Sequence, residues 1–333
     1  MMSLTNSGRF LLNYGLNFVS AIPLIGVSKI LFRRYPISGL ALTISNSVLS
    51  TVFATIVLIF ISKPPPNSQT STNRLQAFLR MLFISGTFTG FITFSNLSLQ
   101  YNPIGTYQIM KLQIPLILMV IEYIQLQFGF NSALLTKEKF HRDYSTSVLY
   151  AFAIIAIGST LSICFDRRFH LLGFAFAGIS ILFNALYQAQ VQGDQVSSTY
   201  ERMRFLQIQT FISLVLLCPG WPFLDNTFEY NKYLFTRWDA LCLLFLCGFL
   251  AFLVNLSVIW CIKDVTTIRF NMVGQLKTFF LVGVLSIFFG ESITFYQIGP
   301  ILFTTGGCIY YAYSINKNEE YYKHQARMVP NNI

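Results

Sequence analysis

Apolar residues come in long runs along this chain, separated by short clusters of charged and turn-forming residues. A helix that crosses a bilayer needs about 20 mainly apolar residues, and runs of that length recur throughout. They predict ten spanning helices, at residues 10–32, 38–62, 79–99, 103–127, 146–165, 171–191, 204–224, 239–262, 269–290 and 295–315. We therefore predict an all-α integral membrane protein with one transmembrane domain over residues 1–333, whose last part, 316–333, is a cytosolic tail.

The composition agrees with a membrane protein. Apolar residues make up 54% of the 333 and charged residues only 11%, whereas soluble domains carry about 25% charged residues. The net charge of +10 comes from basic residues that lie singly or in pairs, so the basic patch that nucleic acid requires is missing. The six cysteines lie in or beside apolar runs, with no histidine at metal-binding spacing. We expect no metal, no cofactor and no nucleic-acid partner.

The distribution of Lys and Arg predicts the orientation, because basic residues collect on the cytosolic side. With the N-terminus in the cytosol and Lys111 and Lys277 set aside, fourteen basic residues lie on the cytosolic side and seven, including Lys29, on the other. This favours both termini in the cytosol. The first apolar run is too long for the core of a signal peptide, which predicts a retained anchor in an endomembrane.

Two lysines lie inside apolar runs, where a cation costs roughly 2.5–3.5 kcal/mol and normally faces a wet cavity or a partner. Lys111 follows the motif Asn96-Leu97-Ser98, and Lys277 follows the similar Asn255-Leu256-Ser257. Five predicted helices separate the two motifs, so the two halves, about 10–165 and 171–315, would be inverted in the membrane. Inverted repeats with a site between them are common in secondary transporters. We therefore predict a central pocket for an anion.

The neighbours of Lys111 suit such a pocket. Tyr107 and Gln108 lie one turn before it on the same helix face, with Thr106 beside them. An ammonium, a phenol and an amide together can hold a phosphate and hydrogen-bond a sugar or base. Pro115 frees a backbone carbonyl one turn after Lys111 and favours a kink.

Around Lys277 the polar residues form a stripe of Asn271, Gln275 and Thr278, and Gly274 leaves space beside the lysine. Such residues also pack transmembrane helices together, and that role is favoured for Asn96 and Asn255. Two roles stay open for Glu122, on the same face as Lys111: a proton or exit-path group, or an interfacial carboxylate.

The segments 94–115 and 251–277 resemble the nucleotide-sugar transporter and triose-phosphate translocator family of the drug/metabolite transporter superfamily, above all the E subfamily of solute carrier family 35. The resemblance implies ten helices in an inverted five-plus-five arrangement. It also implies antiport, in the Golgi or ER membrane, of a cytosolic UDP- or GDP-linked sugar against a luminal nucleoside monophosphate. Lys111 and Lys277 would then hold the phosphates, and the residues around them would line the site.

Two positions bear on the substrate. Sugar-phosphate translocators are similar in placing Lys-Arg on the ninth helix, whereas Lys277 is followed by Thr278, which favours nucleotide sugars. Gln207 is the retained match to the family's pattern on helix seven.

Alternative functions are a sugar-phosphate or phosphoenolpyruvate exchanger and a non-transporting membrane scaffold. No loop presents a pair of carboxylates or a nucleophile with a base, so an enzyme is not expected. The expected partners are an anionic small molecule and the lipid bilayer, and a homodimer is left open.

Overall fold

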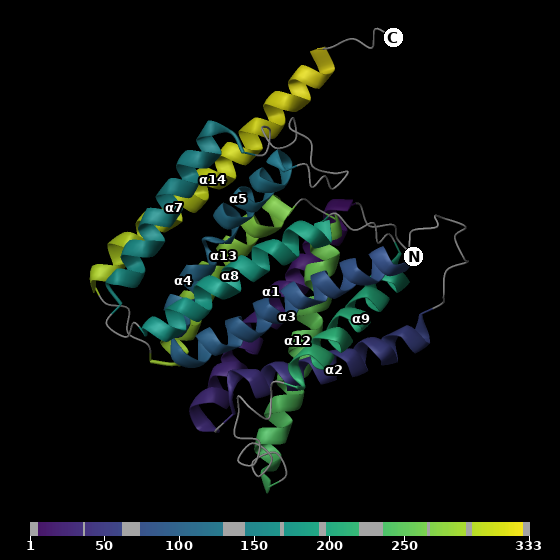
Figure 1. Ribbon diagram of the computed structural model, residues 1–333. Coiled ribbons are helices and arrows are strands. Elements are labelled where there is room, and N and C mark those ends of the chain that lie inside the picture. Colours follow the sequence, from purple (N-terminus) through teal and green to yellow (C-terminus); the bar gives the residue numbers. More distant parts are fainter. Residues whose placement is uncertain are drawn as a thin grey trace. The chain divides into compact units, whose positions relative to one another are not determined.

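The computed structural model describes residues 6–35, 37–61, 74–128, 144–166, 170–192, 198–219, 236–264, 267–290 and 295–328. Within these ranges all regular secondary structure is helical (Figure 1). The helices are α1 (Asn6–Arg34), α2 (Gly39–Phe60), α3 (Arg74–Tyr101), α4 (Ile104–Lys111), α5 (Ile114–Gln127), α7 (Thr146–Cys164), α8 (Leu171–Gln192), α9 (Thr199–Leu217), α12 (Trp238–Asp264), α13 (Thr267–Phe288) and α14 (Phe295–Met328).

Seven segments of the described residues are long and apolar enough to cross a membrane. They are Leu12–Arg34, Gly39–Phe60, Leu75–Tyr101, Ile104–Gln127, Thr146–Cys164, Leu171–Val191 and Trp238–Cys261. The chain is therefore a multi-pass membrane protein, and seven of the predicted spans are confirmed. The other three lie in α9, α13 and α14, which are not among the seven segments.

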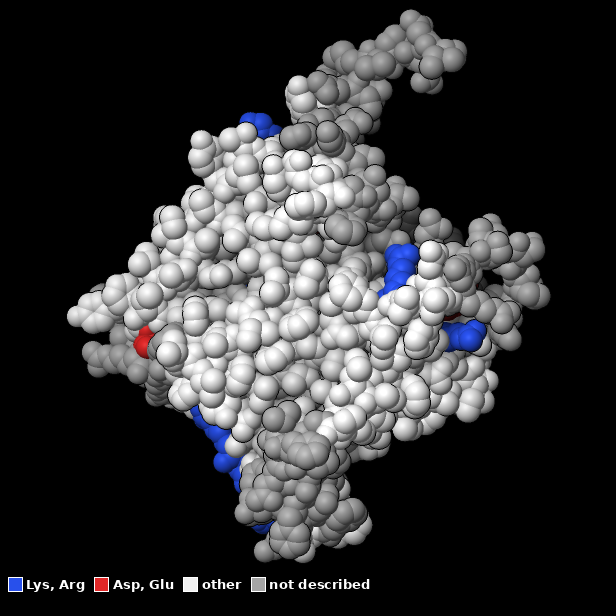
Figure 2. Space-filling model, in the orientation of Figure 1, with Lys and Arg blue, Asp and Glu red and all other residues white. Residues whose placement is uncertain are grey.

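The surface fits contact with lipid. Charged side chains are scarce on the face in Figure 2, and large apolar side chains are exposed on many helices, among them Phe60 and Phe288. In water such exposure would be costly, but lipid tails solvate apolar side chains as a protein interior does.

The helices form two compact units, each assembled from two stretches of chain. Unit 1 contains Met1–Asn102 and His170–Thr266, and unit 2 contains Pro103–Phe169 and Thr267–Ile333. Unit 1 therefore holds α1, α2, α3, α8, α9 and α12, while unit 2 holds α4, α5, α7, α13 and α14.

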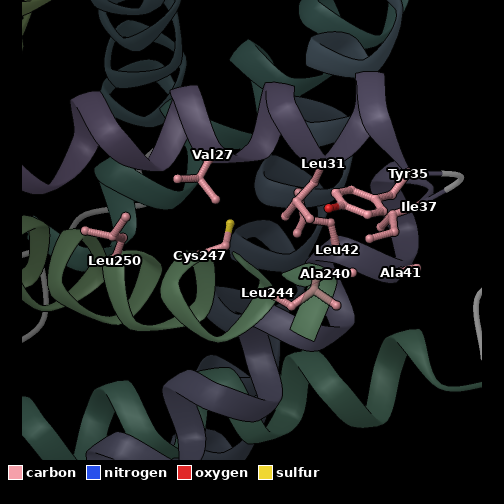
Figure 3. Packing of buried hydrophobic residues seen from close by; sticks show 10 residues of the cluster. All are labelled: Val27, Leu31, Tyr35, Ile37, Ala41, Leu42, Ala240, Leu244, Cys247 and Leu250. Carbon is pink, nitrogen blue, oxygen red and sulfur yellow. The ribbon is translucent and has the colours of Figure 1, made fainter. Parts of the chain in front are cut away.

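In unit 1, α1 packs against α12, α3 against α8, and α2 against α9, α12 and α3. Buried side chains from α1, α2 and α12 form one of its cores, which includes Leu31, Leu42 and Leu244 (Figure 3). Gly39 lets α2 approach α3 closely, because a Cβ at this position would lie 2.9 Å from the backbone nitrogen of Leu97.

In unit 2, α7 and α14 run side by side, and α4 packs against both α13 and α7 (Figure 1). Its core includes Leu112, Phe152 and Tyr311. Gly158 on α7 permits the contact with α14, since a Cβ there would lie only 2.4 Å from the Oγ1 of Thr304. Helix α14 continues to Met328, so most of the predicted tail is helical, and residues 329–333 lie outside the described ranges.

Candidate functional site

The predicted span over residues 103–127 is a broken helix, and the break lies directly after Lys111. Helix α4 ends at Lys111 and α5 begins at Ile114. Between them the amides of Leu112 and Gln113 donate three residues back, to Ile109 O and Met110 O. Pro115 explains the break: in a continuous helix its nitrogen would donate to the carbonyl of Lys111, and proline has no N–H. The predicted kink is confirmed.

Lys111 and Tyr107 form a pair on the last turn of α4. The half-buried Lys111 donates from Nζ to the hydroxyl of Tyr107, and its ammonium lies 4.1 Å from the centroid of the same ring. The pair places an ammonium and a phenol hydroxyl side by side at the end of α4, and an ammonium is a group that binds a phosphate oxygen.

Gln108 lies next to this pair and is almost fully buried, with 2% of its surface exposed. Its Nε2 donor has no hydrogen-bond partner among the residues that the structure describes. A buried donor without an acceptor is costly, commonly about 1–3 kcal/mol.

Thr106, another predicted binding residue, has a hydrogen-bond partner within unit 2. It is buried near the start of α4, and its hydroxyl donates to the carboxylate of Asp166, which follows α7. This contact ties the start of α4 to the end of α7 within unit 2. Asp166 was not predicted as a candidate, because the sequence showed only a loop carboxylate beside two arginines.

Helix α13 carries the second lysine and packs against α4. Lys277 is half-buried, Asn271 is buried, and Thr278 donates from its hydroxyl to the Gly274 carbonyl at 3.2 Å. No heavy atom lies within 4 Å of the place that a Cβ on Gly274 would occupy, so there is open space one turn before Lys277. The side chain of Gln275 lies outside the described residues.

The helices that bear the two lysines thus lie against each other in one unit. Gln207 does not belong to this group: it is on α9 in unit 1, where its Nε2 donates to the hydroxyl of Thr55 at 2.8 Å. The helices α4 and α13, which carry the other predicted binding residues, pack against each other in unit 2, whereas Gln207 is part of a different compact unit.

Both the asparagine and the serine of the repeated Asn-Leu-Ser motif make polar contacts. Asn96 is half-buried and donates from Nδ2 to the Thr43 hydroxyl at 2.9 Å, while Asn255 is half-buried on α12. Ser98 and Ser257 are fully buried, and each accepts a hydrogen bond from an asparagine side chain. These donors are Asn102 Nδ2 at 3.1 Å and Asn17 Nδ2 at 2.9 Å, respectively.

Two further ionisable side chains are buried. Glu122 on α5 is 7% exposed and accepts a hydrogen bond from the Tyr144 hydroxyl at 3.1 Å. Lys29, counted above with the loop charges, lies within α1 and is only 5% exposed. Its place inside the first apolar run could have marked it as unusual in the same way as Lys111 and Lys277.

No family model matches the chain. Among curated proteins, it is 21% identical over 310 residues to a UDP-rhamnose/UDP-galactose transporter, number 2, of Arabidopsis thaliana, covering 92% of this chain and 83% of the relative. It is 23% identical over 305 residues to the GDP-mannose transporter GONST5 of the same plant, covering 88% of this chain and 82% of the relative. Nucleotide-sugar transporters are among its relatives.

Two other comparisons refine this result. A probable sugar phosphate/phosphate translocator of Arabidopsis thaliana is 25% identical over 284 residues, covering 84% of this chain and 73% of the relative. A solved crystal structure superposes on this chain with a TM-score of 0.55 at 14% identity. The superposition covers 94% of this chain and 99% of that one, so the two share a fold over almost their whole length.

Proposed function

We propose that this protein is a nucleotide-sugar transporter that exchanges a cytosolic UDP- or GDP-linked sugar for a luminal nucleoside monophosphate. The observation that carries the proposal is the packing of α4 against α13, each of which carries a half-buried lysine. The relatives named as UDP-sugar and GDP-mannose transporters support the same substrate class. The narrower resemblance, to the E subfamily of solute carrier family 35 and its third member, remains a prediction.

In this proposal Lys111 and Tyr107 bind one face of the phosphate groups. The ammonium supplies charge, and the phenol that accepts a hydrogen bond from it holds the ammonium in place. Gln108, with its buried donor, would hydrogen-bond an acceptor on the base or the sugar. The break after Lys111 leaves the Lys111 carbonyl without its helical partner, which provides an additional polar group at the same place.

Lys277 would contribute the second charge. Gly274, one turn earlier, leaves room for a ligand to reach α13, and Asn271 and Thr278 extend the polar stripe on this helix. Gln275 and Gln207 remain candidates as in the sequence prediction, Gln207 from its separate place on α9.

The inverted five-plus-five repeat of ten helices is also proposed, and the packing supports it. Unit 1 takes the first three predicted helices of each half, and unit 2 takes the last two. Matching the halves in order pairs α1 with α8, α2 with α9, and α3 with α12. If each helix is replaced by its counterpart in the other half, the α1–α12 contact becomes α8–α3 and the α2–α12 contact becomes α9–α3. All four contacts occur.

In unit 2, matching the halves in order pairs α4 and α5 with α13, and α7 with α14. If each helix is replaced by its counterpart, the α4–α7 contact becomes α13–α14, while the α4–α13 and α7–α14 contacts stay the same. All of these contacts occur. Such correspondence is expected when two related halves share a twofold axis.

Charge provides a mechanism for the exchange. Two cations in a low-dielectric bundle resist closure around an empty site, because burying them without a counter-charge is costly. A bound phosphate offsets that cost and allows the loaded site to close. The return step then needs another anion, which couples import of the nucleotide sugar to export of the monophosphate in alternating access. The membrane would be that of the Golgi or the ER, with both termini in the cytosol.

Exchange in proteoliposomes tests the proposal. Purified protein is reconstituted with internal UMP or GMP, and uptake of radiolabelled UDP- and GDP-sugars is measured. We expect rapid uptake only with a matching internal monophosphate. Equally rapid uptake into vesicles without an internal nucleotide would contradict obligatory exchange, and no uptake of any nucleotide sugar would contradict the function.

The alternative sugar-phosphate exchanger rests on the similarity to the probable sugar phosphate/phosphate translocator. It predicts that triose phosphate or phosphoenolpyruvate, rather than UMP or GMP, competes for uptake. A non-transporting scaffold predicts that replacing Lys111 and Lys277 by alanine leaves the protein's function intact.

A further inference from the structure

The end of α3 is shaped by a proline. In a continuing helix the carbonyl of Leu99 would accept from the amide of residue 103, but Pro103 has no N–H, and α3 ends at Tyr101. The carbonyl of Asn102 lies between α3 and α4 and likewise has no place in either helical ladder. A break of this kind inside a membrane segment leaves polar backbone groups that must find other partners.

Lys29 on α1 provides that partner. Its ammonium donates to Leu99 O at 2.8 Å and to Asn102 O at 2.5 Å. Both carbonyls belong to the C-terminal end of α3, where the partial negative charge of the helix favours a cation. Only 5% of the surface of Lys29 is exposed, so these bonds lie away from bulk water. Hydrogen bonds from a charged donor are strong in such an interior.

Asn102, the residue at the break, is held from other sides as well. It is 1% exposed, its backbone amide donates to Ser98 O at 2.8 Å, and its side chain donates to the Ser98 hydroxyl at 3.1 Å. Gly173 on α8 leaves room for it, since a Cβ there would lie 2.6 Å from the Oδ1 of Asn102. The backbone position from which the chain enters α4 is therefore fixed within unit 1.

We propose that Lys29 is a positioning residue for the candidate site on α4. Its buried ammonium satisfies the carbonyls left by Pro103 and so fixes the end of α3. Pro103 is the N-cap of α4, and Tyr107 and Lys111 follow one and two turns later. The predicted effect on nucleotide affinity rests on the proposed function, whereas the effect on the α3–α4 junction does not.

Hydrogen exchange tests the junction directly in the full-length protein in nanodiscs. The readout is a peptide over residues 98–107, which contains the bonded amides of Asn102 and Tyr107. Lys29→Met keeps an unbranched side chain of similar length without donors, and we expect exchange at least about tenfold faster there. Lys29→Arg can still donate to both carbonyls and should restore most of the protection.

Ser20→Ala is the matched control. Ser20 is also buried on α1, but its hydroxyl donates to carbonyls of the same helix, Leu16 O and Asn17 O. It should leave exchange over residues 98–107 unchanged. The proposal would be overturned if hydrogen exchange over residues 98–107 in Lys29→Met kept the wild-type rate. It would also be overturned if Ser20→Ala raised that rate as much as Lys29→Met does.

Binding of UMP and GMP then shows whether Lys29 positions the binding residues on α4 or only stabilises the α3–α4 junction. For the nucleotide that wild-type protein binds, we expect Kd to rise about fivefold in Lys29→Met and to stay near wild type in Lys29→Arg. Faster exchange with an unchanged Kd would make Lys29 a structural contact only and overturn its positioning role. If wild-type protein binds neither nucleotide, the proposed function fails, and the exchange result alone decides whether Lys29 fixes the junction.

Discussion

The two helices that carry the half-buried lysines Lys111 and Lys277 differ in their local structure around the lysine. On the first, Pro115 interrupts the helix, so Lys111 is the last residue of α4 and its carbonyl has lost the usual donor. On the second, α13 runs without interruption through Lys277, and Gly274 provides open space instead. A membrane helix can thus make a polar position usable either by breaking its backbone or by omitting a side chain.

The difference suggests a division of roles. The α4 side presents several donors close together: the ammonium of Lys111, the hydroxyl of Tyr107 and the amide of Gln108. The α13 side presents Lys277 with room beside it. We therefore expect α4 to determine phosphate geometry and α13 to determine how large a ligand fits.

Removing either lysine should have the largest effect, and it tests whether the two helices act together. Lys111→Ala and Lys277→Ala each remove one charge from a desolvated charge pair, which costs roughly 2–5 kcal/mol, so exchange should fall about a hundredfold or more. Radiolabel exchange, normalised to folded protein, measures this. Lys317→Ala, at an exposed position on α14, is the control. Normal exchange by either site variant would refute a shared anion site.

Tyr107→Phe should have the next largest effect. It removes the hydroxyl that accepts from Lys111 but keeps the ring beside the ammonium, so affinity should fall roughly tenfold while the fold is retained. Isothermal titration with the monophosphate and a melting curve give the two readings. Tyr313→Phe, at an exposed tyrosine on α14, should change neither. A lower melting temperature with an unchanged Kd would assign Tyr107 to packing rather than binding.

Gly274→Leu tests the space on α13. The added side chain fills the open volume one turn before Lys277, so we expect about a fivefold loss of affinity with little change in melting temperature. Gly283 also lies on α13 with no heavy atom near its Cβ position, and Gly283→Leu is the matched control. If both variants bind alike, the space beside Gly274 does not receive the ligand.

Pro115→Ala should have the smallest effect of the four. It restores an N–H that can donate to the Lys111 carbonyl and allows α4 and α5 to join, so exchange should fall only about two- to threefold, since the lysine itself remains. The transport assay measures the rate, and hydrogen exchange over residues 111–117 reports whether the helix has closed. A closed helix with unaltered transport would show that the break has no role.

Much of the fold could be predicted from the sequence, because apolar run length and proline chemistry act locally. Seven predicted spans are confirmed, and the kink at Pro115 lies where proline requires it. The packing partners could not be predicted in this way. Whether α4 lies against α13 depends on contacts between residues more than 150 positions apart, which leave no local pattern.

Individual polar residues show the same limit. The sequence favours a packing role for Asn96, but only the folded bundle reveals that Ser98, two residues later, is the fully buried member of the motif. The count of basic residues places Lys29 with Arg33 and Arg34 on the side opposite the cytosol. Its burial follows from the carbonyls at the end of α3, about 70 residues away in sequence.

The interleaving of the two units has a consequence for how the protein is made. Each unit combines a segment from the first half of the chain with a segment from the second half. Neither unit can therefore be completed before the second half has been synthesised. Helix α4, which carries Lys111, lacks its packing partner α13 until that helix is synthesised more than 150 residues later. A chain cut short after residue 166 would leave both units unfinished, a natural target for quality-control proteases.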